Sequence, residues 1–268
     1  MSDSVNYAEL FGFKSIPAAV IFAVCYAPLC CLFVPKAIMR RTYAIFTVTL
    51  FCFMRVSAFI LRAVLIASDS AGENESVFIA DEVLFSIGFF GLLFGAYGLV
   101  LDRLSILTTY KPYNYPLSFL LQNRKLFHLA LVAGMVMGII GITDSTSSTP
   151  DSSGPTLRKA SVIVFMVLTV LQAYQTFILV MYERSETIAH HLGDSIGARH
   201  GAMIFVGISA FLLVREIYMQ ATIGSSVTQN KEYTWYPLVA LPELACVVLY
   251  AVPGVIPPSP SGSYDLPR

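Results

Sequence analysis

Seven ionisable side chains stand inside long apolar stretches of this sequence, and their types make them candidates for chemistry. They are Arg55, Arg62, Asp81, Glu82, Arg215, Glu216 and Glu243. Ionisable residues inside membrane-spanning segments are costly, and they mark ligand sites, ion paths or paired polar networks. Arginine and carboxylate side chains can pair with each other or bind a polar head group. A catalytic pair that shares one proton is not expected from Asp81 and Glu82, because adjacent residues on a helix point about 100° apart.

The apolar stretches around these residues are long enough to cross a membrane. The chain has 268 residues, of which 56% are hydrophobic and 13% are charged, whereas a soluble domain carries about 25% charged residues. A membrane-spanning helix needs about 20 apolar residues. Seven stretches qualify, namely residues 16–35, 42–67, 78–101, 126–143, 161–182, 202–223 and 235–256. They predict an all-α, multi-pass protein of the plasma membrane or an endomembrane, with a seven-helix domain over residues 1–256.

The positions of lysine and arginine predict how the helices cross the membrane. Cytosolic loops carry an excess of these residues. The two sides hold ten residues (Lys36, Arg40, Arg41, Arg103, Lys111, Arg124, Lys125, Arg184, Arg199 and Arg268) and four (Lys14, Arg158, Lys159 and Lys231). We therefore expect the N-terminus outside and the C-terminus in the cytosol, with a disordered, Pro/Ser-rich cytosolic tail over residues 257–268. The net formal charge of zero gives no indication of a nucleic-acid partner.

One outer loop adds a possible modification site. Residues 68–77 contain no lysine or arginine, and Asn74-Glu75-Ser76 forms an N-glycosylation sequon. Its place in the outer loop predicts a glycoprotein. Its closeness to the membrane surface disfavours glycan attachment at Asn74.

The alternating direction of the spans predicts which buried charges meet. Arg62 lies five residues before the end of its stretch, and Asp81 and Glu82 lie just after the start of the next one. We expect Arg62 to pair with Asp81 or Glu82. Arg215 and Glu243 each lie eight residues from the outer edge of their stretches, so a second pair is expected there. Arg55 shares a helix face with Arg62 but has no partner at its depth. A neutral group, a bound anion or a lipid phosphate could satisfy it.

Two interpretations of these pairs stay open. They can hold helices together, as interhelical polar contacts commonly do in membrane bundles. They can also form polar layers around a cavity that opens toward the outer leaflet. Such a cavity would suit a ligand with a polar or anionic head and an apolar body.

Weaker patterns concern packing and metals. Gly134 and Gly138 have the G-x-x-x-G spacing that lets membrane helices approach closely. His190, His191 and His200 lack metal-ligand spacing, so no metal or cofactor is expected. Trp235 and Tyr236, at the outer edge of the last span, are interpreted as part of an interfacial aromatic belt.

Several short segments resemble a known family. Residues 232–242 (EYTWYPLVALP) are similar to the entry of the last span in the fungal lipid-translocating exporters, which include the aminocholesterol-resistance proteins. Residues 215–218 (REIY), 94–103 and 58–62 resemble segments of spans 6, 3 and 2 of that family. Two positions depart from it, because Val239 replaces an aspartate and Arg55 stands about where the family has an acidic residue.

The resemblance implies a fungal source and a protein that binds, translocates or confers resistance to an amphiphilic, lipid-like molecule. Enzymatic activity is not the favoured expectation. Two alternatives remain open. Asp102-Arg103 at the end of the third span resembles the acidic-Arg pair of seven-span receptors. Buried carboxylates are also compatible with a membrane-embedded enzyme such as a terpene cyclase.

Overall fold

The chain folds as an all-α bundle of membrane-length helices. The computed structural model describes residues 6–39, 42–108, 123–146, 153–185 and 196–256, and no strand occurs in these ranges. Within them, seven helical segments are long and apolar enough to cross a membrane. They are α2 (Ile16–Met39), α3 (Tyr43–Ala67), α5 (Glu75–Thr108), α7 (Arg124–Thr146), α8 (Gly154–Ser185), α10 (Gly201–Ala221) and a composite of α12 (Glu232–Trp235), η2 (Tyr236–Ala240) and α13 (Leu241–Ala251). The predicted seven-helix membrane fold is confirmed.

Two helices are longer than their apolar stretches predicted. The third and fifth spans were expected over residues 78–101 and 161–182, whereas α5 and α8 contain 34 and 32 residues. Backbone hydrogen bonding continues a helix past the point where its side chains become polar. These polar extensions carry Arg103 and Arg158 into contact with other helices, and both residues had been assigned to loops.

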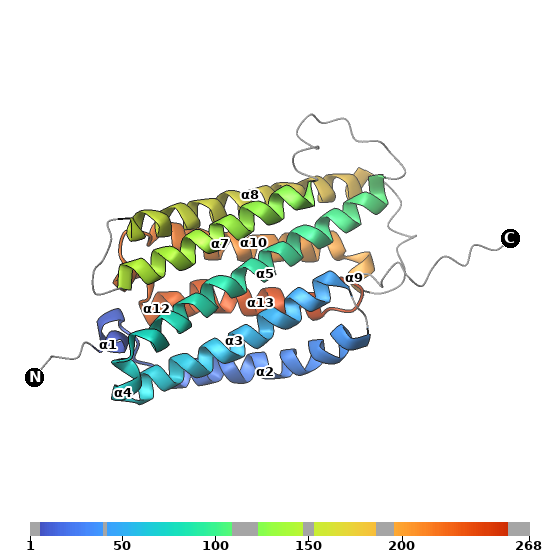
Figure 1. Cartoon of the computed structure of the whole chain (residues 1–268). Helices are drawn as coiled ribbons and strands as arrows, with labels where there is room; N and C mark the ends of the chain where they lie inside the picture. Colours follow the sequence, from blue (N-terminus) through green and yellow to red (C-terminus); the bar gives the residue numbers. More distant parts are fainter. Residues whose placement is uncertain (1–5, 40–41, 109–122, 147–152, 186–195, 257–268) are drawn as a thin grey trace, which may run out of the picture.

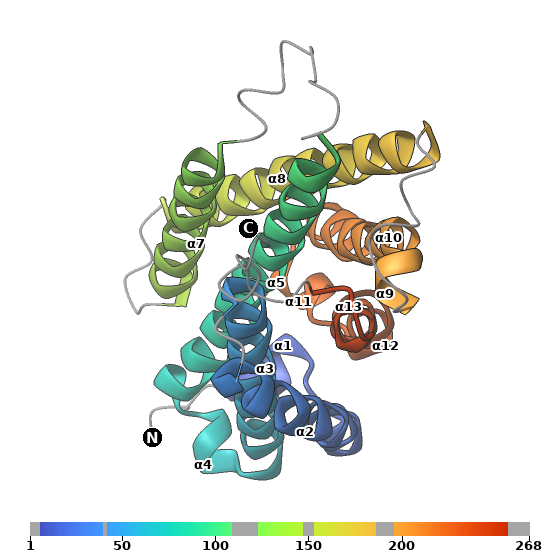
Figure 2. The ribbon, with the colours of Figure 1, turned by 90° about the vertical axis from the view of Figure 1, so that its right-hand side faces the viewer.

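The helices run side by side, so the bundle has two distinct ends (Figure 1). One end carries the short helices α1 (Tyr7–Phe11) and α4 (Asp69–Gly72), and α11 (Ser226–Gln229) contacts α1 there. This end is called the α1 end below. The opposite end carries α9 (Ile196–Arg199) and is called the α9 end. Figure 2, which looks along the bundle, places α5 between the α2–α3 pair and the α7–α8 pair. Since α5 contacts α3, α7, α8 and α10, its side chains can take part in most of the bundle's interior.

Glycines allow α7 and α8 to pack closely. A Cβ atom added at Gly138 would lie 2.8 Å from the hydroxyl of Ser161, and one at Gly141 would lie 2.6 Å from the backbone nitrogen of Arg158. The Ser161 hydroxyl donates a 2.7 Å hydrogen bond to the carbonyl oxygen of Gly134. The close packing predicted from the G-x-x-x-G spacing is therefore confirmed, with α8 as the partner.

The last span is interrupted by a turn of π-helix. Pro237 and Pro242 each lack a backbone N–H, which removes donors from a normal α-helical ladder. Over Tyr236–Ala240 the chain adopts a π-helix, and the N–H of Leu241 donates to the carbonyl of Tyr236. Such turns are rare and frequently mark functional sites. Glu243 follows in the first turn of α13, so this break sets the position of a buried carboxylate.

Candidate functional site

The predicted pair between Arg62 and Asp81 forms in the half of the bundle nearest the α1 end. Both Nε and Nη2 of Arg62 donate to Oδ2 of Asp81, at 3.0 and 2.7 Å. Glu82 Oε1 lies 3.8 Å from the same guanidinium. Arg62 and Asp81 are buried, so the depth estimate from the sequence was sound for this pair.

Aromatic rings surround the Arg62 guanidinium. Its central carbon lies 4.3 Å from the ring centre of Phe13, 4.2 Å from Phe85 and 4.3 Å from Trp235. The face of an aromatic ring attracts a cation, and more strongly when water is excluded. Trp235 and Tyr236 are buried, so their interpretation as interfacial belt residues was wrong. Trp235 covers a buried charge instead.

A second set of pairs centres on Glu243. Arg215 Nε donates to Glu243 Oε1 at 3.3 Å, as expected from their equal depths. Arg55 Nη2 donates to the same oxygen at 2.7 Å. Arg55, for which the sequence indicated no charged partner at its depth, therefore pairs with a protein carboxylate. Arg215 also donates through Nη1 to the neighbouring Glu216.

These contacts connect four buried side chains into one continuous chain, in the order Arg55, Glu243, Arg215, Glu216. We call this set the charge chain. It contains two arginines and two glutamates, so its formal charge is zero. The side chains of Arg55 and Glu243 are 0% and 1% exposed, which means that each charge depends on its protein partners rather than on water.

Aromatic rings also flank the charge chain. The Arg55 guanidinium lies 4.9 Å from the ring centre of Phe51 and 4.7 Å from that of Phe85. Arg215 lies 3.7 Å from Phe89. Phe85 thus contacts both Arg55 and Arg62 and separates the charge chain from the Arg62–Asp81 pair.

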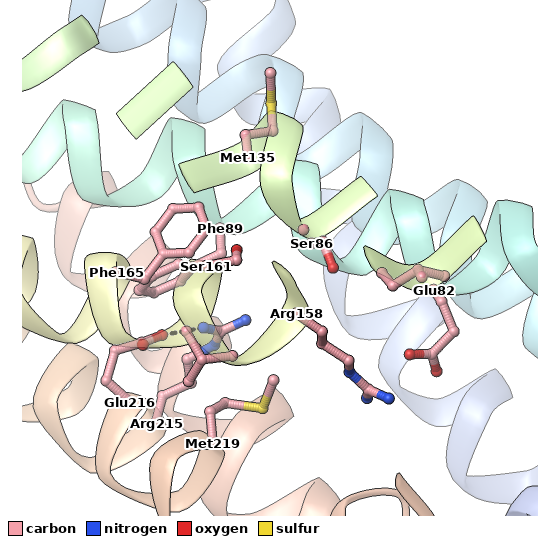
Figure 3. Close-up of a pocket in the computed structure, with 13 residues that line it drawn as sticks. Glu82, Ser86, Phe89, Met135, Arg158, Ser161, Phe165, Arg215, Glu216 and Met219 are labelled. Carbon is pink, nitrogen blue, oxygen red and sulfur yellow. Dashed lines mark hydrogen bonds and ion pairs between the residues drawn. The ribbon is translucent and has the colours of Figure 1, made fainter. Parts of the chain in front are cut away.

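A cavity of about 60 Å³ adjoins one end of the charge chain (Figure 3). Helices α5, α7, α8 and α10 enclose it. Its polar lining residues are Glu82, Ser86, Arg158, Ser161, Arg215 and Glu216. Its apolar and small lining residues are Phe89, Met135, Gly138, Ile142, Val162, Phe165 and Met219. The cavity therefore presents both charged and apolar surface inside the membrane-spanning bundle.

Glu216 has unused hydrogen-bonding capacity at this cavity. Arg215 pairs with its Oε1, as the dashed line in Figure 3 marks. Oε2 is buried and has no hydrogen-bond partner. A buried acceptor without a partner costs about 1–3 kcal/mol, and more when it is charged. A donor from a bound molecule would remove that cost.

Two polar contacts link charged residues of the cavity to the segment that follows α10. Arg158 Nη2 donates to Gln229 Oε1 at 2.5 Å. Asn230 Nδ2 donates to Glu82 Oε1 at 3.3 Å. Gln229 and Asn230 are 3% and 4% exposed. Residues 229–230 therefore hold two charged side chains of the lining from outside the cavity.

The predicted residues divide between the cavity and the packed core. Glu82, Arg215 and Glu216 line the cavity. Four others, Arg55, Arg62, Asp81 and Glu243, do not line it and are ion-paired between helices. Each predicted polar layer therefore reaches this cavity only in part, through Glu82 in one layer and through Arg215 in the other. Arg158 was missed, because it precedes the apolar stretch of its span and was counted as a loop charge.

The receptor-like pair at the α9 end has separate partners. Arg103 Nε donates to Glu183 Oε1 at 3.0 Å, and its Nη1 donates to the carbonyl of Gly197 at 3.2 Å. Asp102 pairs instead with Arg124. Arg103 thereby connects α5 with α8 and α9, while Asp102 connects α5 with α7.

Other predicted features lie at the edges of the bundle. Asn74 is exposed, and its Oδ1 accepts a 3.0 Å hydrogen bond from the N–H of Ser76. Its glycosylation stays a prediction. His190, His191 and the tail over residues 257–268 lie outside the described residues.

Comparison with known proteins gives a family. A family model for a domain of unknown function, DUF7702, matches residues 15–256. The chain belongs to this family. No curated protein and no solved structure matches the sequence.

The DUF7702 match has a structural counterpart. It begins next to Ile16, where α2 begins, and ends beyond Ala251, where α13 ends. All seven membrane-length segments, the charge chain and the cavity therefore belong to the family domain. The short helix α1 precedes it.

Proposed function

We propose that this DUF7702 protein binds an amphiphilic, lipid-like molecule whose polar head group occupies the cavity between α5, α7, α8 and α10. The observation that carries the proposal is the lining of that cavity, which combines polar and apolar side chains. Glu216 supplies a buried, unpartnered oxygen, and Phe89, Phe165 and Met135 supply apolar surface around it. A small number of polar groups within a mostly apolar pocket is typical of ligand sites.

The size of the cavity limits what it can hold. Its volume of about 60 Å³ accommodates a head group or a few water molecules. Whole small-molecule ligands occupy pockets of about 300–1,000 Å³. The cavity is therefore too small for the apolar body of the ligand. This body lies along the apolar surfaces of the helices after residues 229–230 or a neighbouring helix have moved. The small volume disfavours a cyclase, whose polyprenyl substrate would have to fold inside a closed pocket.

The proposed orientation gives the binding site a side of the membrane. With the N-terminus outside, the α1 end faces outward, and the cavity draws its ligand from the outer leaflet. The resemblance to lipid-translocating exporters supports an amphiphile as ligand. Translocation of that amphiphile, or resistance to it, is the cellular role that we propose.

Photolabelling of the purified full-length protein in lipid nanodiscs tests the binding proposal. The probes are long-chain alcohol, amine and carboxylate amphiphiles with a diazirine close to the head group. Peptide mapping is expected to find label on the cavity-lining parts of α5, α7, α8 or α10. The variant Met135→Trp fills the cavity and is expected to reduce labelling at least about tenfold.

The neighbouring residue provides a matched control. Val136 is exposed on the outer surface of α7, so Val136→Trp places the same side chain toward lipid and is expected to leave labelling unchanged. The binding proposal fails if none of the probes labels the cavity helices, or if Met135→Trp and Val136→Trp are labelled equally.

A further inference from the structure

The charges around the cavity are balanced. Its lining contains two carboxylates, on Glu82 and Glu216, and two guanidinium groups, on Arg158 and Arg215. Each has a protein partner. Arg215 contacts both Glu216 and Glu243, Arg158 contacts Gln229, and Glu82 contacts Asn230. The lining therefore has a formal charge of zero.

The layer behind the cavity is balanced as well. The charge chain joins Arg55 and Arg215 to Glu243 and Glu216, two residues of each sign. A charged head group would add one uncompensated charge to this set. Charge interactions are strong in a medium of low polarity, and an isolated buried charge is costly there. The balance favours a head group without net charge.

The lining offers unoccupied hydrogen-bonding positions of both kinds. Arg215 uses Nε and Nη1 for its two carboxylate partners, which leaves Nη2 to donate, and the Ser86 hydroxyl can donate as well. Oε2 of Glu216 has no partner and can only accept while the carboxylate is ionised. The Ser161 hydroxyl uses its hydrogen for the carbonyl of Gly134, which leaves its oxygen to accept. A ligand that both donates and accepts hydrogen bonds therefore matches this lining. A carboxylate or a fully ionised phosphate has no hydrogen to offer.

We propose that the cavity selects uncharged head groups that both donate and accept hydrogen bonds, above all a hydroxyl group, which can donate to Oε2 of Glu216 and accept from Ser86 or Arg215. This inference rests on the proposed amphiphile-binding function and names the ligand class for the same site. A long-chain alcohol fits both requirements. A protonated amine donates but adds a positive charge, and a carboxylate adds a negative charge and only accepts.

Competition between matched amphiphiles tests this selectivity. The photoactivatable long-chain alcohol is bound to the full-length protein in neutral phosphatidylcholine nanodiscs. The unlabelled alcohol, amine and carboxylate of the same chain length then compete for labelling. The alcohol is expected to compete at least about tenfold better than either charged analogue.

A substitution at Glu216 tests the residue itself. Glu216→Gln keeps the shape of the side chain, and Arg215 keeps its contact with Glu243. Hydrogen bonds to charged groups are stronger than those to neutral ones, so the variant is expected to lose about tenfold in affinity for the alcohol. Glu183→Gln changes an equivalent arginine-paired carboxylate at the α9 end, outside the cavity, and is expected to bind like the wild type.

The outcomes separate the two proposals. If the amine or the carboxylate competes more strongly than the alcohol, the head-group inference is overturned. The proposed function is still upheld in that case, provided that Met135→Trp prevents the labelling. Absence of cavity labelling by all three amphiphiles overturns the proposed function itself. If Glu216→Gln does not fold, as judged by size-exclusion chromatography, the competition series on the wild-type protein decides the inference alone.

Discussion

Arg55 on α3 and Glu243 on α13 form a buried ion pair of 2.7 Å between residues 188 positions apart in the sequence. The same carboxylate oxygen accepts from Arg215 on α10. Glu243 therefore joins three helices from different parts of the chain. Its position after the π-helical turn Tyr236–Ala240 makes the last span the element that completes the polar core.

Glu243 should be the more sensitive member of this pair. Glu243→Gln removes the charge that serves both Arg55 and Arg215, and breaking a buried pair costs about 3–5 kcal/mol. Arg55→Met should cost less, because Glu243 keeps Arg215 as its partner. Denaturant unfolding in detergent, followed by circular dichroism, measures both losses. The exposed Glu73→Gln is the control, and equal losses for Glu243→Gln and Arg55→Met would contradict the shared role of Glu243.

The sequence predicted the elements that depend on local composition and on depth. Hydropathy located all seven spans, and counting residues from the span ends predicted that Arg62 meets Asp81 or Glu82 and that Arg215 meets Glu243. These predictions worked because consecutive antiparallel helices place residues of equal depth at one level. The pairs connect α3 with α5 and α10 with α13, which follow each other in the order of the membrane-length helices.

The remaining contacts depend on which helices pack side by side, and the hydropathy of the sequence does not determine these neighbours. Arg55 meets a helix from the opposite end of the sequence. Counted from the span edges, its depth differs from that of Glu243 by four residues, or about 6 Å, which a long arginine side chain can cover. Arg158 joined the cavity because α8 begins before its apolar stretch. Trp235 became a core residue because a buried guanidinium lies against its ring.

Two glycines in different surroundings, Gly141 where α7 packs on α8 and Gly98 in α5, should respond differently to substitution by alanine. A Cβ at Gly141 would lie 2.6 Å from the backbone nitrogen of Arg158, whereas a Cβ at Gly98 would have no atom within 4 Å. Gly141→Ala is expected to destabilise the protein by about 1–3 kcal/mol through overpacking. Gly98→Ala should be neutral or stabilise it by up to about 1 kcal/mol, because alanine favours the helix. Unfolding in detergent compares them, and a stable Gly141→Ala variant would mean that α7 and α8 can separate without cost.

The orientation in the membrane predicts which engineered cysteines are accessible in intact cells. Glu73 directly follows α4 at the α1 end, Arg199 is the last residue of α9, and both are exposed. A membrane-impermeant maleimide is expected to label Glu73→Cys in intact cells and Arg199→Cys only after permeabilisation. The parent protein is the control, because its five cysteines lie within α2, α3 and α13. The reverse pattern would place the cavity in the cytosolic half of the membrane.

Residues 229–230 are expected to control access to the cavity. The double variant Gln229→Ala, Asn230→Ala removes the contacts to Arg158 and Glu82, and each such hydrogen bond contributes about 0.5–1.5 kcal/mol. In a Ser86→Cys background, a small water-soluble thiol reagent should therefore react about tenfold faster with the cavity cysteine. Val227→Ala, on the exposed side of the same segment, should leave the rate unchanged. An unchanged rate in the double variant would show that the cavity is reached between helices, rather than past Gln229 and Asn230.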